Sequence, residues 1–364
     1  MRPGMNSLLA LLRGQPADPN PSDTEWEAAL ALAEDEHLLP YAAARLRSRQ
    51  ASPTPRITDR LNQIDRDAAK AAFYWTSELK GLLGAFHQAG IPAVPLKGPC
   101  LAERLYGGTA LRVSRDLDLL VSQSNLARAE AVLTAIGFVP GSPDDYHRPW
   151  RRETTTVELH HDVENPLAFN FHVESALNRA RPATFCGEST WLLAPEDELL
   201  FLCLHAVRHR FERLSLILDL QFAFEKLPNA TEAWQPRAEV AELNGLLTLG
   251  LAMARRLQPG LTVAVSLPLS KPHTQHLDRL ADRLWQRLLT QPSEPLDWSA
   301  VHAFYVEIEQ PGWPRLHRRY RHLQIFFSRA IARDYAFAAR FGLHRAWQVR
   351  LMRPLRLLSD RMRR

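Results

Sequence analysis

Two aspartates spaced two residues apart, Asp116 and Asp118, have the types and spacing that point most directly to chemistry in this 364-residue chain. They lie in the segment R-V-S-R-D-L-D-L-L-V at 112–121, and an apolar run follows them. Side chains two apart on a β-strand point to the same face, so the pattern predicts two neighbouring carboxylates. Such a pair needs water, a basic side chain or a divalent cation between its members. Mg²⁺ is the natural cation, since it binds carboxylates together with substrate phosphates.

A third carboxylate, Glu158, lies in the segment T-T-T-V-E-L-H-H at 154–161, whose β-branched start predicts another strand. Glu158 and His160 share one face of this strand, and the apolar residues beside them point the other way. We expect this strand and the aspartate strand to belong to one sheet. Asp116 and Asp118 would then be metal ligands. Glu158 would be a third ligand, or the base that takes a proton from an acceptor hydroxyl.

The segment I-P-A-V-P-L-K-G-P at 91–99 predicts a short strand that leads into a turn and a helix. Gly98 lets the backbone approach a ligand closely, and Pro99 suits the first position of a helix. A strand that leads into a glycine and a helix start is a typical phosphate site, to which Lys97 would add a positive charge. The alternative is an ordinary strand–turn–helix connection that binds nothing. Metal ions would explain why acidic residues lie beside an anion site, because they bind both carboxylates and phosphate oxygens.

Helical and strand spacing predicts the elements that must position these residues. Strands are expected in the middle of the chain and helices on either side, which divides it into segments 1–80, 81–190 and 191–364. The expected elements are a helix start at 22–25, helices at 58–89, 100–106 and 125–136 (the last capped by Asn125), a helix from 196 to 213, and paired strands at 146–150 and 154–159.

The composition is that of a soluble globular protein, with 46% hydrophobic and 23% charged residues. The three cysteines, Cys100, Cys186 and Cys203, are widely spaced, which argues against a disulfide framework and against a thiolate zinc site. No apolar run is long enough for a transmembrane helix, and the short apolar stretch near the start is a poor signal peptide. We therefore expect a cytoplasmic protein.

Positive charge gathers at the C-terminal end of the chain. The net charge is +5, but residues 315–364 contain 14 arginines, no lysine and two aspartates, so the remainder is net negative. Aromatic and apolar residues alternate with the arginines, which predicts one or two amphipathic basic helices. The simplest interpretation is a solvated basic face on a packed helix. The alternatives are an anionic partner, either lipid or nucleic acid, and the acidic remainder of the chain itself.

Two histidines, His205 and His209, lie one helical turn apart in a leucine-rich region. Asp219 is the nearest third ligand for a zinc ion, but the segment lacks the glutamate of the H-E-x-x-H pattern. Structural histidines, and contacts to substrate or phosphate, are the other two interpretations. We expect Arg208 and Arg213, in the same region, to be surface charges.

An ordered set of short motifs resembles the uncharacterised bacterial nucleotidyltransferase family of the polymerase-β-like superfamily. The set comprises L-K-G at 96–98, Tyr106, R-x-x-x-D-x-D-L-L-V at 112–121, V-E-L-H at 157–160, and His205, His209 and Asp219 further on. The resemblance covers about residues 80–225. It implies an α+β fold in which a small mixed nucleotidyltransferase sheet is flanked by a helical N-terminal segment and a large helical C-terminal part.

The resemblance also implies roles for individual residues. Gly98 matches the glycine that opens the phosphate-contacting helix, Asp116 and Asp118 match the metal-binding pair, and Glu158 matches the third carboxylate. The sequence departs from the superfamily pattern twice: proline follows Gly98 where serine is usual, and the third acid is glutamate instead of aspartate.

The predicted activity is an Mg²⁺-dependent transfer of a nucleoside monophosphate from an NTP to an acceptor hydroxyl, with two metal ions and with ATP as the favoured donor. Lys97, Gly98, Arg112 and His160 are the candidate nucleotide contacts, and Arg112 can instead pair with a carboxylate of the aspartate motif. The acceptor would be a small molecule such as a sugar, a peptide, a protein side chain or a nucleic acid end. The alternatives are an inactive nucleotide-binding or antitoxin-like accessory protein, and a phosphoryl transferase that releases ADP.

Overall fold

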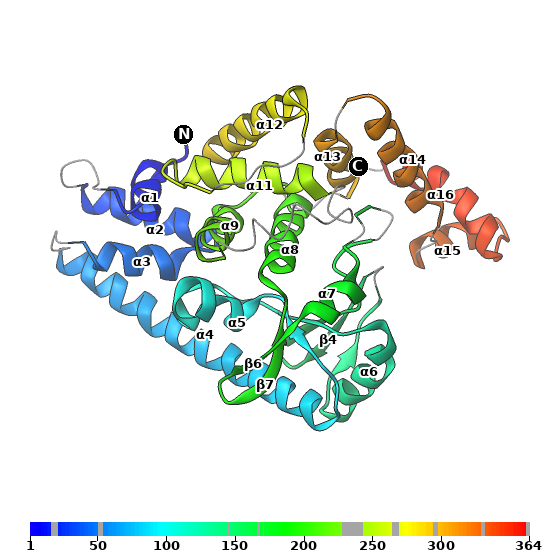
Figure 1. The fold of residues 1–364 in the computed structure, drawn as a ribbon, viewed down its shortest axis with the longest axis horizontal. Coiled ribbons are helices and arrows are strands. Elements are labelled where there is room, and N and C mark those ends of the chain that lie inside the picture. The colour runs from blue at the N-terminus through cyan, green and yellow to red at the C-terminus, as the bar shows by residue number, and fades with distance from the viewer. Residues whose placement is uncertain are drawn as a thin grey trace.

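The computed structural model describes residues 1–15, 21–49, 54–143, 146–165, 168–169, 171–227, 243–263, 269–293, 298–309, 311–328 and 332–361. Helices predominate in these ranges, and the strands form a five-stranded sheet and a two-stranded hairpin (Figure 1). The fold is α+β, as predicted: a small mixed sheet has helices before it and after it in the chain.

Four helices precede the sheet: α1 (Met5–Leu12), α2 (Asp23–Asp35), α3 (Leu39–Arg47) and α4 (Pro55–Gln88). The predicted start at 22–25 is confirmed, because Ser22 and Glu25 cap α2 reciprocally. The long helix expected at 58–89 is α4, whose first turn is capped by the Thr54 side chain. Gly90 follows α4 in the left-handed conformation that favours glycine and turns the chain toward the sheet.

The main sheet has the strand order β1-β2-β5-β4-β3. Its strands are β1 (Val94–Pro95), β2 (Leu117–Leu120), β3 (Val139–Pro140), β4 (His147–Arg152) and β5 (Thr155–His160). The central pair β2–β5 is parallel and the other pairs are antiparallel. The predicted pairing of the segments at 146–150 and 154–159 is therefore confirmed as β4–β5. The hairpin β6–β7 (Arg181–Phe185 and Glu188–Leu192) contacts the edge strand β1, because Trp191 donates its backbone N–H to Ala93.

Short helical elements connect the strands: α5 (Gly98–Leu101), the π-helical turn η1 (Ala102–Tyr106), the 3₁₀ turns η2 (Thr109–Leu111) and η3 (Gln123–Asn125), α6 (Leu126–Ala135) and α7 (Val173–Arg179). The helix predicted at 125–136 is α6, but Asn125 does not cap it. The Asn125 side chain instead donates to Ser122 and accepts from Arg128, so both of its polar groups are engaged elsewhere.

Eight helices of the described residues follow the hairpin: α8 (Pro195–Arg208), α9 (Leu214–Lys226), α11 (Asn244–Leu257), α12 (Lys271–Thr290), α13 (Trp298–Ile308), α14 (Trp313–Ser328), α15 (Ala332–Ala339) and α16 (Ala346–Arg361). The basic tail thus contains three helices where the sequence predicts one or two. A turn at Phe341–Gly342, in which Gly342 is left-handed, separates α15 from α16. These three helices lie together at one end of the molecule (Figure 1).

Strand β2 lies between two hydrophobic clusters. Leu117, Leu119 and Val121 belong to one cluster, which contains the last turns of α4 and residues of α6. Leu120 belongs to the other cluster, which joins helices α1–α3 to α8, α9, α11 and α12. Because successive side chains of a strand alternate between its faces, Asp118 shares the Leu120 face. The sequence alternation at 117–121 therefore turns Asp118 away from the cluster that contains Leu117, Leu119 and Val121.

None of the helices in the described ranges combines the length and the apolar character needed to span a lipid bilayer.

Candidate active site

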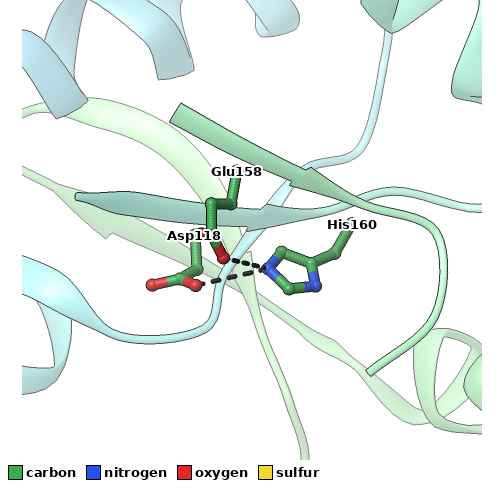
Figure 2. Close-up of side chains that lie close together, drawn as sticks. All are labelled: Asp118, Glu158 and His160. Carbon is green, nitrogen blue, oxygen red and sulfur yellow. Dashed lines mark hydrogen bonds and ion pairs between the residues drawn. The ribbon is translucent and has the colours of Figure 1, made fainter. Parts of the chain in front are cut away.

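The parallel pairing of β2 with β5 brings the predicted acidic residues together. Asp118 pairs in register with Glu158, and Leu120 pairs with His160 two positions further along. Asp118, Glu158 and His160 therefore project from one face of two neighbouring strands, as Figure 2 shows. The convergence of Asp118 and Glu158, which the sequence predicts, follows directly from this register.

His160 lies between the two carboxylates. Its Nε2 is 3.2 Å from Asp118 Oδ1 and 3.4 Å from Glu158 Oε2, and one ligand atom of each residue lies within 4.8 Å of the other two (Figure 2). Two carboxylates and an imidazole at this separation are donors that divalent cations accept. No other group of three such donors this close occurs in the part of the chain that the structure describes.

Two further side chains surround this group. Lys97 Nζ lies 3.1 Å from Asp118 Oδ2, which is the oxygen that His160 does not contact. His147 Nε2 lies 3.8 Å from Glu158 Oε2, and the His147 ring stacks on the His160 ring. Basic groups on two sides thus balance the charge of Asp118 and Glu158.

The pKa values of the three residues reflect two opposing effects, burial and ion pairing. Burial alone would raise the pKa of Asp118, but Lys97 and His160 together hold it well below its usual range. The pKa of Glu158 is also lowered, because its contact with His160 outweighs its burial. Conversely, burial would lower the pKa of His160, but its contacts with Asp118 and Glu158 raise it. Both carboxylates are therefore ionised at neutral pH.

Asp116 lies one residue before β2, which begins at Leu117, so it is not on the strand as the spacing predicts. It is half-buried and is not a member of the close donor group. Burial, followed by the neighbouring charge of Asp118, raises the pKa of Asp116 to about 6. Asp116 instead lines an open cavity next to the group.

This cavity has a volume of about 370 Å³. Lys97, Gly98 and Asp116 line it on the side of the sheet, and residues of α8 and α9 and of the loop between them line it on the other side. A larger cavity of about 680 Å³, between α4 and the β6–β7 hairpin, has His87 as its one ionisable lining residue. The smaller cavity is therefore the better candidate for chemistry.

Gly98 lies in the cavity wall, at the start of α5. Its backbone is left-handed, with φ of +70°, which strains any residue with a side chain. A Cβ at this position would make an ordinary van der Waals contact, 3.5 Å from a methyl group of Leu117. The left-handed backbone, and not a lack of space, therefore favours glycine at the turn between β1 and α5.

Arg112 contacts a carboxylate outside the aspartate motif. Its guanidinium forms two hydrogen bonds with Asp219 of α9, at 2.9 and 2.8 Å, and Tyr106 donates a third to the same carboxylate at 2.6 Å. Burial would lower the pKa of Arg112, but Asp219 raises it. Arg112, which also lines the cavity, therefore serves an ion pair that joins α9 to the loop before β2.

The same contacts occupy Asp219, the residue that the zinc interpretation needs as its third ligand. His205 and His209 pack against each other, with ring centroids 4.7 Å apart, and both line the cavity. Asp219 is engaged by Arg112 and Tyr106, and the three residues do not form a close donor group among the described residues. Burial, followed by Lys97, holds the pKa of His205 well below its usual value, so its imidazole is neutral.

The prediction that Arg208 is a surface charge is wrong. Arg208 is buried, and it donates to Glu164 Oε2 at 3.2 Å while its guanidinium lies 4.6 Å over the Tyr146 ring. Tyr305 of α13 donates to the same Glu164 oxygen at 2.7 Å. Arg208 can be buried on an apolar helix because it pairs with the carboxylate of Glu164, which is 44 residues away in the sequence.

Among the ionisable residues of the cavity lining, the sequence predictions give no role to His37, Arg115 and Glu212, and they give Arg213 only as a surface charge. Arg115 directly precedes Asp116, and that adjacency is the one signal that the sequence offers. Arg213 contacts His37 across 176 residues of sequence, which no local spacing reveals. Among the described residues, neither Arg115 nor Arg213 has a carboxylate partner within ion-pair distance. The cavity lining therefore includes two cationic side chains without an ion-pair partner in the described chain, beside the carboxylates of Asp116 and Glu212.

The buried environment of His37 gives a pH prediction. Burial, followed by Arg213, Arg115 and Arg112, lowers its pKa to about 4. Because the unfolded chain binds this proton near pH 6.5, stability is lost as pH falls from about 6.5 toward 4. We expect His37→Asn, which tolerates the left-handed backbone at this position, to lose less unfolding free energy between pH 7 and pH 4.5 than the wild type. Urea titrations at both pH values measure this difference, and equal losses would contradict the assignment.

Comparison with known proteins gives two findings. The sequence model of a family described as uncharacterised nucleotidyltransferase matches residues 22–259, which include every residue of the donor group and of the cavity. No curated protein sequence matches the chain. Among solved structures, the solution structure of the antibiotic-resistance factor ANT(2'')-Ia is similar at 14% identity and a TM-score of 0.35, covering 46% of this chain and 94% of that one.

Proposed function

The chain belongs to the uncharacterised nucleotidyltransferase family, and we propose that it transfers a nucleoside monophosphate, AMP in the first instance, from an NTP to an acceptor hydroxyl with the help of Mg²⁺. In this reaction the acceptor oxygen attacks the α-phosphorus, the bond to the bridging oxygen breaks, and pyrophosphate leaves.

One observation carries the proposal. Asp118 and Glu158 are register-paired on adjacent parallel strands, and they lie beside a cavity whose lining includes Lys97, Gly98 and Asp116. Carboxylates next to cationic side chains that have no ion-pair partner suit a metal–triphosphate substrate, because the metal binds the carboxylates and the phosphates bind the cations.

Asp116, Asp118 and Glu158 would hold the metal, and His160 lies close enough to be a further ligand or to orient the two strand carboxylates. When bound, the metal ions would neutralise charge on the phosphate oxygens and bring the two substrates together. Lys97, which pairs with Asp118 and also lines the cavity, would be free to contact a phosphate once a cation satisfies that carboxylate.

Glu158 is the best-placed base for the acceptor hydroxyl. Its side chain is 28% exposed, whereas that of Asp118 is 2% exposed, so an acceptor can approach Glu158 from solvent. Its lowered pKa keeps it ionised at neutral pH, which a proton acceptor requires.

The reaction class can be tested with radiolabelled ATP. The protein is incubated with Mg²⁺, a cell extract as the source of acceptor, and ATP labelled at the α- or the γ-phosphate. We expect label to move to a product from the α-position alone, with release of pyrophosphate. Transfer from the γ-position with release of ADP would instead establish a phosphoryl transferase. Failure of both labels to move, with or without ATP binding, would favour an inactive accessory protein.

The lack of an ion-pair partner, among the described residues, for Arg213 in the cavity wall gives a further prediction. We expect Arg213→Gln to raise the dissociation constant for Mg·ATP about tenfold or more, since a charge-assisted hydrogen bond contributes about 1.5–3 kcal/mol. Titration calorimetry with Mg·ATP measures the change.

Arg181→Gln is the matched control for Arg213→Gln, because it removes the same charge from an exposed position on β6. An unchanged dissociation constant in the Arg213 variant would place the triphosphate elsewhere.

A further inference from the structure

In the basic tail, two helices expose large apolar side chains to solvent and bury arginines, whereas helices in the body of the protein bury their apolar side chains. Of the 13 large apolar residues that are exposed in the described chain, nine lie between Trp313 and Leu355. Apolar side chains scattered singly over a surface are ordinary, whereas this many in one short segment indicate a contact surface. The tail also lies beyond the residues that the family model matches.

Helix α14 exposes its apolar face and buries its polar one. Trp313, Leu316, Tyr320 and Leu323 follow the spacing of a single helical face, and each is more than half exposed. The opposite face carries Arg315, Arg318 and His322, of which the last two are buried.

These polar residues attach α14 to the body of the protein. Arg318 donates to Glu309 Oε1 at 2.8 Å, and its guanidinium lies 4.2 Å over the Phe169 ring. Arg315 donates to the Glu309 carbonyl at 2.9 Å, and the His322 ring stacks on His302. The contacts that hold α14 in place therefore leave its apolar face pointing to solvent.

Helix α16 repeats the arrangement. Trp347, Leu351 and Leu355, at intervals of four residues, form an exposed apolar face. On its other side, the buried Arg356 donates to Asp334 of α15 at 2.6 Å. Two separate helices thus present tryptophan and leucine to solvent and use arginine for internal packing.

Arginines border these apolar faces. Arg319 and Arg321 lie on either side of the apolar face of α14, and the exposed Arg350 borders that of α16. The two acidic residues of the segment from 315 onward are Asp334, which is bound internally, and Asp360. Apolar side chains flanked by cations are complementary to a surface that is anionic at its boundary and apolar beneath.

From this arrangement we propose that helices α14 and α16 form a docking surface for an anionic lipid bilayer, with their apolar faces inserted at the headgroup boundary. A nucleic acid fits the arginines but not the four exposed leucines, because bases stack on aromatic rings and gain little from aliphatic side chains. A second copy of the same surface would bring two strongly basic segments together. The bilayer is the partner that uses both the charge and the apolar side chains.

Vesicle co-sedimentation of the full chain tests the proposal. We expect binding to vesicles that contain phosphatidylglycerol, weaker binding to vesicles of phosphatidylcholine alone, and loss of this preference in high salt. The double variant Leu316→Gln/Leu323→Gln should raise the apparent dissociation constant for the anionic vesicles at least about tenfold, because both side chains would lie in the apolar boundary.

The control variant Phe73→Gln/Val139→Gln replaces two exposed apolar residues outside the tail and should bind vesicles like the wild type. Equal binding to the two kinds of vesicle, no binding to either, or an undiminished affinity in the leucine variant would overturn the proposal. So would tighter binding to an RNA oligonucleotide that the leucine substitutions leave unchanged. A dimer in sedimentation velocity that the same substitutions dissociate would also overturn it, in favour of self-association.

Discussion

Asp118→Asn is expected to lower the rate of nucleotidyl transfer by about 10³-fold, since losing a metal-binding carboxylate forfeits on the order of several kcal/mol of charge stabilisation. Asparagine keeps the shape of the side chain but removes the charge that pairs with Lys97 and His160. The measurement is the initial rate of pyrophosphate release with saturating Mg·ATP and a cell extract. Mg·ATP binding should weaken in parallel, and more so in the double variant with Asp116→Asn.

A matched control separates catalysis from folding. Asp197, on α8, is also buried and pairs with an arginine, at 2.9 and 2.8 Å from Arg179, but it does not line the cavity. Asp197→Asn should lose stability in the same way while keeping its rate within a few-fold of the wild type. A rate for Asp118→Asn within tenfold of the wild type would remove Asp118 from the reaction.

The second large effect concerns stability. Asp219→Ala is expected to lower the free energy of unfolding by about 3–5 kcal/mol, because breaking a buried ion pair leaves an uncompensated charge. The substitution would strand the Arg112 guanidinium, which is 14% exposed, together with the buried hydroxyl of Tyr106. Urea-induced unfolding followed by circular dichroism measures the loss.

Asp282→Ala is the control for the ion pair. Its carboxylate lies 2.7 Å from Arg256 but is 68% exposed, and exposed pairs contribute at most about 1 kcal/mol. A loss below about 1 kcal/mol for Asp219→Ala would mean that the Arg112–Asp219 pair is solvated in the folded protein.

The sequence predicts the elements around the site well, because their signals are local. Alternating apolar residues at 117–121 and 157–160 define the two strands, and Ser22 with Glu25 defines a helix start. Both strands bear an acid on one face, so predicting that the acids lie close together required only the assumption that the two strands pair. The exception is Asp116. The alternation of β2 is correct, but the strand begins at Leu117, so Asp116 lies one residue before it.

The sequence singles out His205 and His209 in the other half of the cavity as candidate substrate contacts, but the arrangement of that half could not be predicted, since it depends on contacts between distant residues. Arg112 and Asp219 are 107 residues apart, and both belong to elements with no polar pattern that links them. His37 comes from the turn after α2, and Arg208 is buried because Glu164 lies near it in space. Periodicity identifies the buried face of an element, but not the partner that the face will meet.

The register between β2 and β5 has a consequence for how this chain tolerates changes in length. Residues can be inserted in the connections before β2 or between α6 and β4 without turning any side chain of the two strands. Deleting one residue inside β2 or β5, however, would exchange the two faces of that strand. Asp118 or Glu158 would then point into an apolar cluster. A leucine would take its place beside the carboxylate of the other strand. Length variation in active relatives should therefore be confined to the connections, with none inside these two strands.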